Sequence, residues 1–318
     1  MKNIFYFILI SILSLTFISC AKEDDSSSSD NSSSSSSSSG TFVAVGASGT
    51  LLTSSDAITW TSRTSGTSNN LRSFAFDGSS TGVAVGFSGT ILSSTDGITW
   101  TSRTSGTSKN INNVAYGNSK FIAVGDNGTT LYSSDGINWT DWTSSCGAND
   151  NESLWDVAYG NSTWVAVGDN GSIYTSDESS CTKRTSGTTV EFNELIYGDS
   201  TFVAVGNNGT VLTSTDGITW TSRTSGTTNN LYGGAYYNYG GSSGITLVGE
   251  SGKTLYFTDN YTSLTAWSAA SMTNDILVIS PHFTNSMTWK HYLVSIRFTP
   301  SQVSVFHPPE IRVWQRST

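Results

Sequence analysis

Five acidic residues occur at positions that are not repeated elsewhere in this sequence, and acid–base chemistry is the first possibility to test. They are Glu152, Asp156, Glu191, Glu194 and Glu250. Glycoside hydrolysis needs two carboxylates at a fixed separation, one acting as an acid and the other as a base or nucleophile. Nothing in the spacing of these acids selects such a pair, so we expect them to lie on the solvated surface.

Histidine, the side chain best suited to proton transfer near neutral pH, is absent from residues 41–279. His282, His291 and His307 lie beyond that range, without the spacing typical of metal ligands. The Asp-Asn-Gly stretches at 126–128 and 169–171 could suggest calcium, but they are more typical of tight turns. We therefore predict no catalytic residues, no metal and no cofactor, and we expect that the chain is not an enzyme.

Arginine clusters are the next possibility, because sialidases hold a substrate carboxylate with three guanidinium groups. Residues 41–279 contain Arg63, Arg72, Arg103, Arg184 and Arg223. All except Arg72 precede the same recurring Thr-Ser-Gly phrase, which spreads them through the repeats. The sequence therefore predicts no arginine triad, and Arg72 stands out as the one arginine at a non-repeated position.

The N-terminal 20 residues have the features of an export signal that ends in a lipidated cysteine. Lys2 is followed by an apolar run, and Ser19-Cys20 resembles the end of a bacterial lipobox, with Phe17 where leucine is usual. The run is short for a transmembrane helix. The resemblance implies that Cys20 carries lipid; an ordinary signal peptide or a membrane anchor with an incidental cysteine is the alternative.

Residues 21–40 are rich in serine and acidic residues and cannot be buried, so we expect a disordered tether. Together with the signal, the tether predicts a protein of the bacterial cell envelope that is held at the membrane by its N-terminal lipid. Exported proteins form disulfides, and Cys146 and Cys181 are the remaining cysteines. We predict a bond between them, with two free thiols as the alternative.

The composition is that of an all-β chain. Charged residues make up 12%, and the formal net charge is −9. Glycine, serine, threonine and asparagine are abundant and suit short strands joined by tight turns. An acidic chain also argues against nucleic acid as the main partner, because binding phosphates needs a basic surface.

One apolar phrase recurs six times at intervals of about 40 residues. Its copies are Phe42–Gly46, Gly82–Gly86, Phe121–Gly125, Trp164–Gly168, Phe202–Gly206 and Ile245–Gly249. We read four strands a to d in each unit, of the kinds 111–116, 121–125, 90–94 and 98–103. Four short strands in about 40 residues predict a β-propeller of antiparallel blades over residues 41–279, with a solenoid as the lesser alternative.

The turn between strands c and d carries a second signature, in which an aspartate precedes a tryptophan by four residues. The pairs are Asp56 and Trp60, Asp96 and Trp100, Asp135 and Trp139, and Asp216 and Trp220. The aspartate suits a tight turn, and the tryptophan suits packing between blades. This pattern resembles the Asp-box, or bacterial neuraminidase repeat. With the Phe-Val-Ala-Val-Gly strand, it is similar to the propeller family of photosystem II stability and assembly factors, which implies the fold rather than work on a photosystem.

Residues 280–318 differ in composition and hold all four prolines. Alternating segments at 292–298, 303–306 and 311–315 predict strands, so we favour a degenerate seventh blade. A six-bladed ring is the alternative. The chain enters its first blade at strand b, and residues 275–279 could supply the missing strand a. The tail would then be an appendage, or the product of an altered reading frame.

Antiparallel strands place the d–a and b–c loops on one face of the ring and the a–b loops and aspartate turns on the other. The first face is the variable one, and we predict that it binds a partner. Our candidate residues are Arg72, Phe87, Asp126, Trp142, Trp155, Asp169, Tyr232 and Glu250. The predicted function is therefore that of a monomeric scaffold for a protein or glycan. A carbohydrate-active hydrolase and a surface antigen without a specific ligand are the alternatives.

Overall fold

The computed structural model describes most of the repeat region and three short segments outside it. The described residues are 15–19, 41–55, 59–146, 152–177, 180–239, 242–258, 263–266, 279–282 and 290–293. Cys20, Asp56, the whole tether and most of the tail therefore lie outside the described residues. No helix in the described part of the chain is long and apolar enough to cross a membrane.

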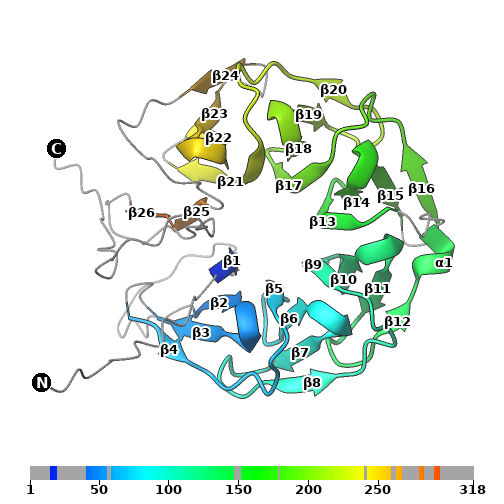
Figure 1. Ribbon diagram of the computed structural model, residues 1–318, viewed down its shortest axis with the longest axis vertical. Helices are drawn as coiled ribbons and strands as arrows, with labels where there is room; N and C mark the ends of the chain where they lie inside the picture. Colours follow the sequence, from blue (N-terminus) through cyan, green and yellow to red (C-terminus); the bar gives the residue numbers. More distant parts are fainter. Residues whose placement is uncertain are drawn as a thin grey trace, which may run out of the picture.

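Six four-stranded antiparallel sheets are arranged around a central opening, as predicted for a β-propeller (Figure 1). Blade 1 consists of β1 (Leu15–Ser19), β2 (Phe42–Gly46), β3 (Leu51–Ser54) and β4 (Thr61–Ser62). Blade 2 consists of β5 (Leu71–Phe76), β6 (Gly82–Gly86), β7 (Ile91–Ser94) and β8 (Thr101–Arg103). Blade 3 consists of β9 (Ile111–Gly117), β10 (Lys120–Gly125), β11 (Thr130–Ser133) and β12 (Thr140–Asp141). Blade 4 consists of β13 (Leu154–Gly160), β14 (Thr163–Gly168), β15 (Ile173–Ser176) and β16 (Cys181–Arg184). Blade 5 consists of β17 (Phe192–Gly198), β18 (Thr201–Gly206), β19 (Val211–Ser214) and β20 (Thr221–Ser222). Blade 6 consists of β21 (Leu231–Tyr239), β22 (Ser242–Gly249), β23 (Thr254–Thr258) and β24 (Ser263–Ala266).

Short helical segments join these strands. The 3-10 turns between strands b and c are η1 (Ala47–Gly49), η2 (Phe87–Gly89), η3 (Asp126–Gly128), η4 (Asp169–Gly171), η5 (Asn207–Gly209) and η6 (Glu250–Gly252). The Asp-Asn-Gly stretches are thus turns, as predicted. The helix α1 (Thr143–Cys146) follows blade 3.

The five residues that recur in strand b are apolar and buried in blades 1 to 5, as expected for a strand covered on both faces. Five apolar clusters fill the interfaces between successive blades from blade 1 to blade 6. At the first interface, Val43 and Val45 of β2 pack in one cluster with Leu71 and Phe74 of β5. No single blade could bury these faces alone, so the ring is one cooperative packing unit.

The outermost strand is shorter than the sequence predicted. In blade 2 we expected strand d over residues 98–103, but β8 begins at Thr101. The carboxylate of Asp96 accepts hydrogen bonds from the backbone N–H groups of Ile98 and Thr99, which curls these residues into the turn. Those N–H groups therefore bond the turn carboxylate instead of extending the strand.

The inner strand of blade 1 comes from an unexpected segment. Our alternative of residues 275–279 is not what occupies this position: β1 is formed by Leu15–Ser19, inside the predicted export signal. Of residues 275–279 only Ile279 is described, and it begins β25 (Ile279–His282), which pairs with β26 (Lys290–Leu293). This two-stranded sheet contacts β21, so the described structure fits a blade count of six to seven.

Candidate functional site

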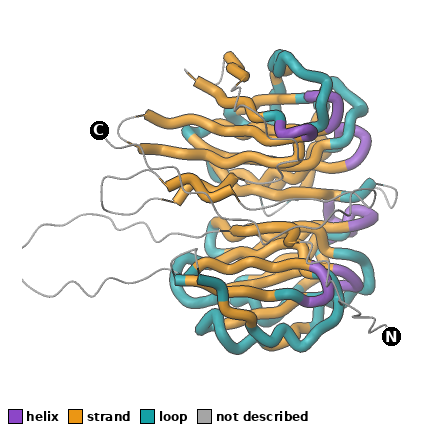
Figure 2. The backbone as a smooth tube through the Cα atoms, turned by 60° about the vertical axis from the view of Figure 1, so that its left-hand side comes forward, coloured by secondary structure: helices purple, strands orange, loops and turns teal. Residues whose placement is uncertain are grey.

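The b–c turns and d–a loops lie on the same side of the ring, which we call the variable face (Figure 2). In blades 2 to 6 the first residue of each b–c turn donates its backbone N–H to the d–a loop. Phe87, for example, bonds the carbonyl of Asn70 at 2.9 Å. We call the other side, which carries the a–b turns and the aspartate turns, the Asp-turn face. There Asn161 of an a–b turn donates to the carbonyls of Ser200 and Thr215 in blade 5.

A β-bulge gives the variable face its side chains. In each of blades 2 to 6 the register of strand a against strand b shifts after the first residue of strand a. The bulged residues are Arg72, Asn112, Trp155, Asn193 and Tyr232. A bulge re-aims its side chain and frees it from ladder pairing. This feature explains why the second position of strand a varies from blade to blade.

Arg72 is the centre of a cluster that joins blades 2, 3 and 4. Its guanidinium carbon lies 4.5 Å from the ring centroid of Phe87 and 5.4 Å from that of Trp155. The same guanidinium donates to the side-chain oxygen of Asn112 at 2.7 Å. Asn112 in turn donates to the carboxylate of Asp126 at 3.0 Å. Asn112 is buried and links the other four side chains of the cluster, which are all partly exposed.

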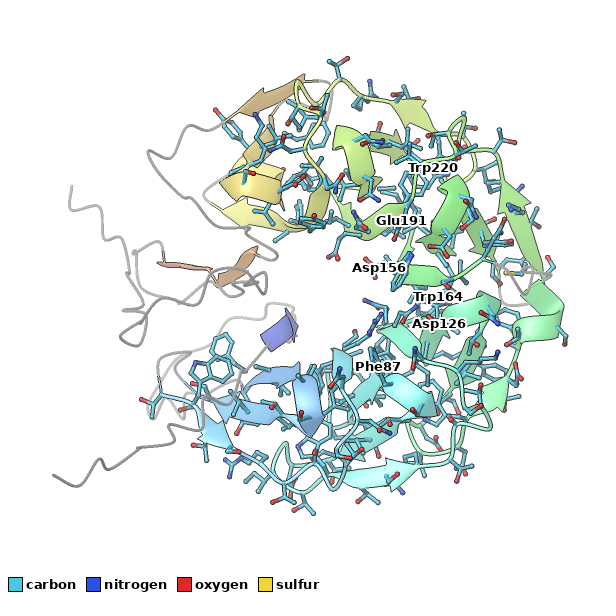
Figure 3. The ribbon with its side chains drawn as sticks, in the orientation of Figure 1. Phe87, Asp126, Asp156, Trp164, Glu191 and Trp220 are labelled. Atoms are coloured by element: carbon cyan, nitrogen blue, oxygen red, sulfur yellow. The ribbon has the colours of Figure 1, made fainter. Side chains whose placement is uncertain are left out.

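Trp155 carries the cluster on into blade 4. Its indole N–H donates to the carboxylate of Asp169 at 2.6 Å. Burial and the nearby Asp169 raise the pKa of Glu191 above its usual value. Figure 3 shows Glu191 toward the inner end of its blade. Arg72, Trp155 and Asp169 therefore place a cation, an indole and a carboxylate in successive contact.

The structure brings five of the eight predicted face residues into this one network: Arg72, Phe87, Asp126, Trp155 and Asp169. Tyr232 and Glu250 occupy the corresponding positions of blade 6 and share Asn230 as a hydrogen-bonding partner. They therefore belong to the same face but not to the same group of contacts.

Trp142 lies outside this network, and its assignment to the binding face stays a prediction. It follows the outer strand β12 and packs into the apolar cluster between blades 3 and 4, with its ring 6.0 Å from that of Tyr132. Cys181, which stands where other blades have their turn tryptophan, lies against the same cluster. Trp142 thus fills apolar space at an interface whose usual tryptophan is missing.

Cys181 is disulfide-bonded in the structure. Helix α1, which ends at Cys146, packs beside β16, which begins at Cys181. The side chain of Cys146 lies outside the described residues, so its identity as the partner stays a prediction.

None of the five non-repeated acids is fully exposed, contrary to our expectation, and Asp156 is buried. Asp156, in the residue after the bulge of β13, is 5% exposed, and its carboxylate accepts backbone N–H bonds from Leu195 and Val157. Burial raises the pKa of Asp156 to about 7. Burial, together with the Asp156 carboxylate, also raises the pKa of Glu194 well above its usual value.

The bond from Leu195 gives Asp156 a structural role, because Ser73 makes the equivalent link between blades 2 and 3. The hydroxyl of Ser73 accepts the backbone N–H of Val114 at 3.3 Å, just as Asp156 accepts that of Leu195 at 2.6 Å. A carboxylate that is buried and doubly bonded to backbone is poorly placed to exchange protons with a substrate.

The aspartate turns of blades 2, 3 and 5 have one shared geometry. In each, one carboxylate oxygen accepts two backbone N–H groups, and the tryptophan indole N–H donates to the glycine carbonyl of the turn. The residues are Asp96 and Trp100, Asp135 and Trp139, and Asp216 and Trp220. Each tryptophan ring also packs against the cluster between its own blade and the preceding one. Trp60 is partly buried.

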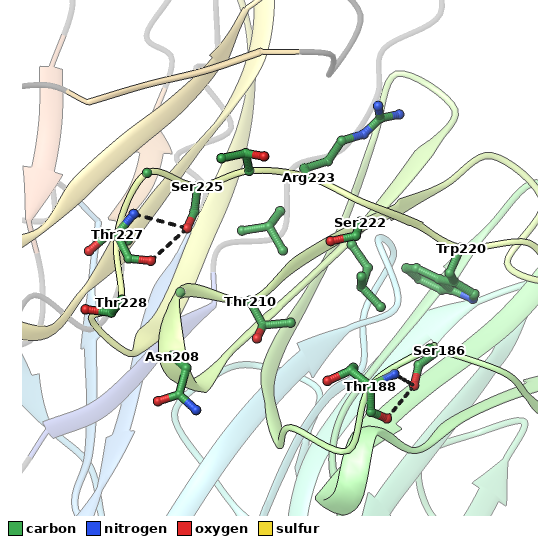
Figure 4. A pocket seen from close by; sticks show the side chains of 16 residues that line it. Ser186, Thr188, Asn208, Thr210, Trp220, Ser222, Arg223, Ser225, Thr227 and Thr228 are labelled. Carbon is green, nitrogen blue, oxygen red and sulfur yellow. Dashed lines mark hydrogen bonds between the residues drawn. The ribbon is translucent and has the colours of Figure 1, made fainter.

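A groove of about 1010 Å³ lies between blades 4 and 5 (Figure 4). It is lined mainly by hydroxyl groups from two copies of the repeated Thr-Ser-Gly phrase, such as Ser186 and Ser225. Each of these serines is held by hydrogen bonds to a threonine two residues ahead. Because the lining is repeat structure, the groove offers no feature specific to one ligand.

No protein-family model matches the sequence, and no curated protein matches it. Solved structures do match. A structure described as "YCF48 bound to D1 peptide" has a TM-score of 0.63 at 16% identity, over 91% of this chain and 90% of that one. YCF48 from Cyanidioschyzon merolae has a TM-score of 0.62 at 15% identity, over 89% and 94%. The fold is a β-propeller.

Other propellers share the likeness. The WD40 propeller domain of Doa1 has a TM-score of 0.62 at 14% identity, over 90% of this chain and 95% of that one. The GH74 enzyme of Niastella koreensis has a TM-score of 0.54 at 15% identity, over 80% of this chain but only 37% of the enzyme. All these sequence identities are low, so the comparisons support a shared fold with these proteins and no shared function.

Proposed function

We propose that this chain is an exported, lipid-anchored propeller that binds a protein partner through its variable face and is not itself an enzyme. One observation carries the proposal. Arg72, Phe87 and Trp155 come from three different strands or turns of two blades, yet they stack on one another at the surface. Rigid aromatic and arginine side chains of this kind are the residues that dominate protein interfaces.

Charge supports the chemistry of the partner. Asp126, Asp169, Glu191 and Glu250 bring four carboxylates to the variable face, while Arg72 is already held between two rings and an amide. A segment that carries lysine or arginine side chains would complement these carboxylates and stack on the exposed edges of the rings. Among the similar folds, YCF48 is described as bound to a peptide, which supports a polypeptide ligand.

The entry point of the chain supports an orientation. Thr41 precedes β2, and a Cβ placed on Gly97 in the blade 2 aspartate turn would lie 3.7 Å from the Thr41 side chain. Thr41, at the start of the described repeat region, therefore lies on the Asp-turn face. A lipid on Cys20 would turn that face toward the membrane and leave the variable face directed away from it, accessible to a partner.

The partner-binding proposal is tested by photo-crosslinking in intact cells. A photoreactive amino acid in place of Phe87 should crosslink a partner, whereas the same group in place of Ile98, which is 54% exposed on the Asp-turn face, should not. Crosslinks at position 98 alone would contradict the proposed face.

The captured partner then allows an affinity measurement. Trp155→Ala should weaken binding about thirtyfold, since a buried aromatic anchor contributes about 2 kcal/mol. Ile98→Ala is the matched control and should leave the affinity unchanged. Equal affinities for wild type and the Trp155 variant would show that the stacked cluster is not the contact surface.

Lipid anchoring is tested separately. Mass spectrometry of the protein from its native envelope should find Cys20 as the first residue, with the added mass of lipid. A chain that keeps its first 19 residues would overturn the export part of the proposal without touching the binding face.

A further inference from the structure

The inner edge of blade 1 is covered by backbone that the export signal supplies. β1 pairs antiparallel with β2, with Leu15 opposite Gly46, Phe17 opposite Val45, and Ser19 opposite Val43. The register shifts after Leu15, as it does after the first residue of the inner strand in every other blade. β1 therefore occupies the position of an ordinary strand a.

Signal processing would remove this strand completely. Cleavage before Cys20 takes away every residue of β1 and leaves β2 without an inner neighbour. Gly46 donates its N–H to Thr50, on the outer side of the strand, so by alternation the N–H groups of Val43 and Val45 point toward the vacated position. Backbone groups of a buried strand are costly to leave unpaired, and Val43 and Val45 are buried.

We propose that the processed protein uses this slot beside β2 to bind an extended apolar segment of a partner protein as a sixth inner strand. This inference rests on the signal cleavage assumed under the proposed function, but not on the variable face. Backbone hydrogen bonds would supply the affinity, and the apolar interface with blade 2 would select the side chains. β1 itself shows the kind of segment that fits, because Leu15–Ser19 is extended and mostly apolar.

The backbone N–H of Ala47 marks the end of the slot next to the variable face. In blades 2 to 6 the first residue of the b–c turn donates its N–H to a carbonyl just before strand a. Ala47, the corresponding residue of blade 1, makes no such bond within the described residues. A partner segment that extends one residue beyond the start of β1 would supply that carbonyl.

The described tail strands pair with each other and not with β2, so neither of them fills the slot. β25 pairs with β26 along its whole length and lies against β21 of blade 6. Pro281 stands in the middle of β25 and has no N–H to offer to a ladder. β25 is therefore a poor competitor for the slot.

The test uses a fluorescent peptide with the sequence of residues 12–19 as the probe and the processed protein from the envelope as the target. The peptide should bind saturably and should slow amide exchange at Val43 and Val45. A matched peptide with N-methyl groups on the amides of Phe17 and Ser19, which face β2 in this register, should bind at least tenfold more weakly. The full chain that keeps residues 1–19 should not bind the probe, because its own β1 fills the slot.

Several outcomes would overturn the proposal. Amides of Val43 and Val45 that are already protected in the processed protein would mean that the slot is filled by the tail, or by a second copy if the protein elutes as a dimer. Equal binding of the N-methylated peptide would mean that backbone pairing is not the cause.

A second variant tests the slot even if the processed chain folds poorly or the signal is not cleaved. Phe17→Pro in the full chain should prevent β1 from pairing and so open the slot without cleavage. This chain should bind the peptide, and if it is unfolded alone, the peptide should restore its β-sheet circular dichroism. No binding and no recovery in either chain would refute the slot, whereas a native N-terminus at Met1 would refute the export part of the proposed function and, with it, the use of the slot in the natural protein.

Discussion

The two faces of the ring are built from the same repeat, but they are held together in different ways. On the Asp-turn face a side chain stabilises each turn, because the carboxylate of Asp96, Asp135 or Asp216 accepts hydrogen bonds from the N–H groups of its turn. On the variable face backbone bonds close each b–c turn, and asparagine side chains of the d–a loops add a bond to the second turn residue in blades 1, 2 and 5. The turn η2 is tied by bonds from Phe87 N–H to Asn70 and from Thr90 N–H to Phe87, none of which involves the side chain of Phe87.

This difference explains where the sequence can vary. A turn held by a carboxylate must keep its aspartate, so the Asp-turn face repeats itself. A turn that closes through backbone bonds does not need its first side chain for closure. That position is Ala47, Phe87, Asp126, Asp169, Asn207 and Glu250 in the six blades. The variable face can therefore change its chemistry blade by blade without loss of the fold.

The largest effect should come from a glycine that allows the backbone-held turn to pack. Gly89 has φ +69°, and a Cβ there would lie 1.9 Å from the carbonyl oxygen of Thr107 in the d–a loop. Both the left-handed backbone and the clash oppose a side chain, so Gly89→Ala should lower the free energy of unfolding by roughly 3 kcal/mol or more in urea titrations.

Gly106→Ala is the matched control for this change. Gly106 has φ +78°, but a Cβ there meets nothing within 4 Å. Only the left-handed conformation is penalised, at about 1 kcal/mol. Equal losses in the two variants would mean that loop packing contributes nothing to the variable face.

Trp142→Ala sharpens the boundary between the variable face and the scaffold. Trp142 packs in the cluster between blades 3 and 4, so its truncation should lower the free energy of unfolding by about 3 kcal/mol. Affinity for a captured partner, measured per folded molecule, should stay unchanged. A loss of affinity without a loss of stability would show that Trp142 contacts the partner and is not part of the scaffold.

The case of Trp142 shows what sequence reasoning can and cannot reach. The strands, blades and faces were predictable because the repeat period and the alternation of side chains are local signals. The meeting of Arg72 with Trp155 was not, because it depends on the bulge in strand a and on the placement of two blades in the ring. Trp142 has the composition of an interface residue, and only packing reveals that it replaces a missing turn tryptophan.

The buried acids were missed for a related reason. Asp156 follows the bulge in β13 at the same position as Ser73 in β5, and both accept a backbone N–H from the next blade. An alignment of the repeats by strand a would have matched the two positions. It would not have shown that the position is buried, because burial there results from closing the ring.

A smaller effect should follow from Glu194→Gln. The pKa values of Asp156 and Glu194 are both raised in the folded protein, that of Asp156 to about 7. A raised carboxyl pKa gives stability that is present below about pH 4 and is lost as the pH rises through the folded pKa. The variant removes one of two like charges, so it should be more stable than wild type by about 1 kcal/mol at pH 8 and equal to it at pH 4.

Glu152→Gln is the control of opposite sign. Although burial alone would raise the pKa of Glu152, hydrogen bonds from Lys183 and Tyr174 lower it overall. This variant should be less stable than wild type at pH 8. Urea titrations at pH 4, 6 and 8 measure both effects, and a Glu194 variant that tracks wild type at every pH would contradict the buried pair.

The smallest effect tests the Asp-turn face itself, through Asp216→Asn. Oδ1 of Asp216 accepts the N–H groups of Ile218 and Thr219 and the hydroxyl of Ser214, and an asparagine oxygen could accept all three. The hydrogen bond from the backbone N–H of Thr219 is the main cause that lowers the pKa of this carboxyl, and the bonds from Ile218 and Ser214 lower it further. A lowered pKa gives stability that is present above about pH 4 and is lost as the pH falls through the folded pKa.

The Asp216 variant keeps the acceptor and loses only the charge, so it should be less stable than wild type at pH 7 by no more than about 1 kcal/mol, because water screens this exposed turn. The difference should shrink as the pH falls from 5 toward 2, since wild type then loses its charge as well. Asp216→Ala removes the acceptor and should cost more than the asparagine variant at every pH. If alanine and asparagine were equally tolerated, the turn would not depend on its side chain, and the contrast between a carboxylate-held face and a backbone-held face would fail.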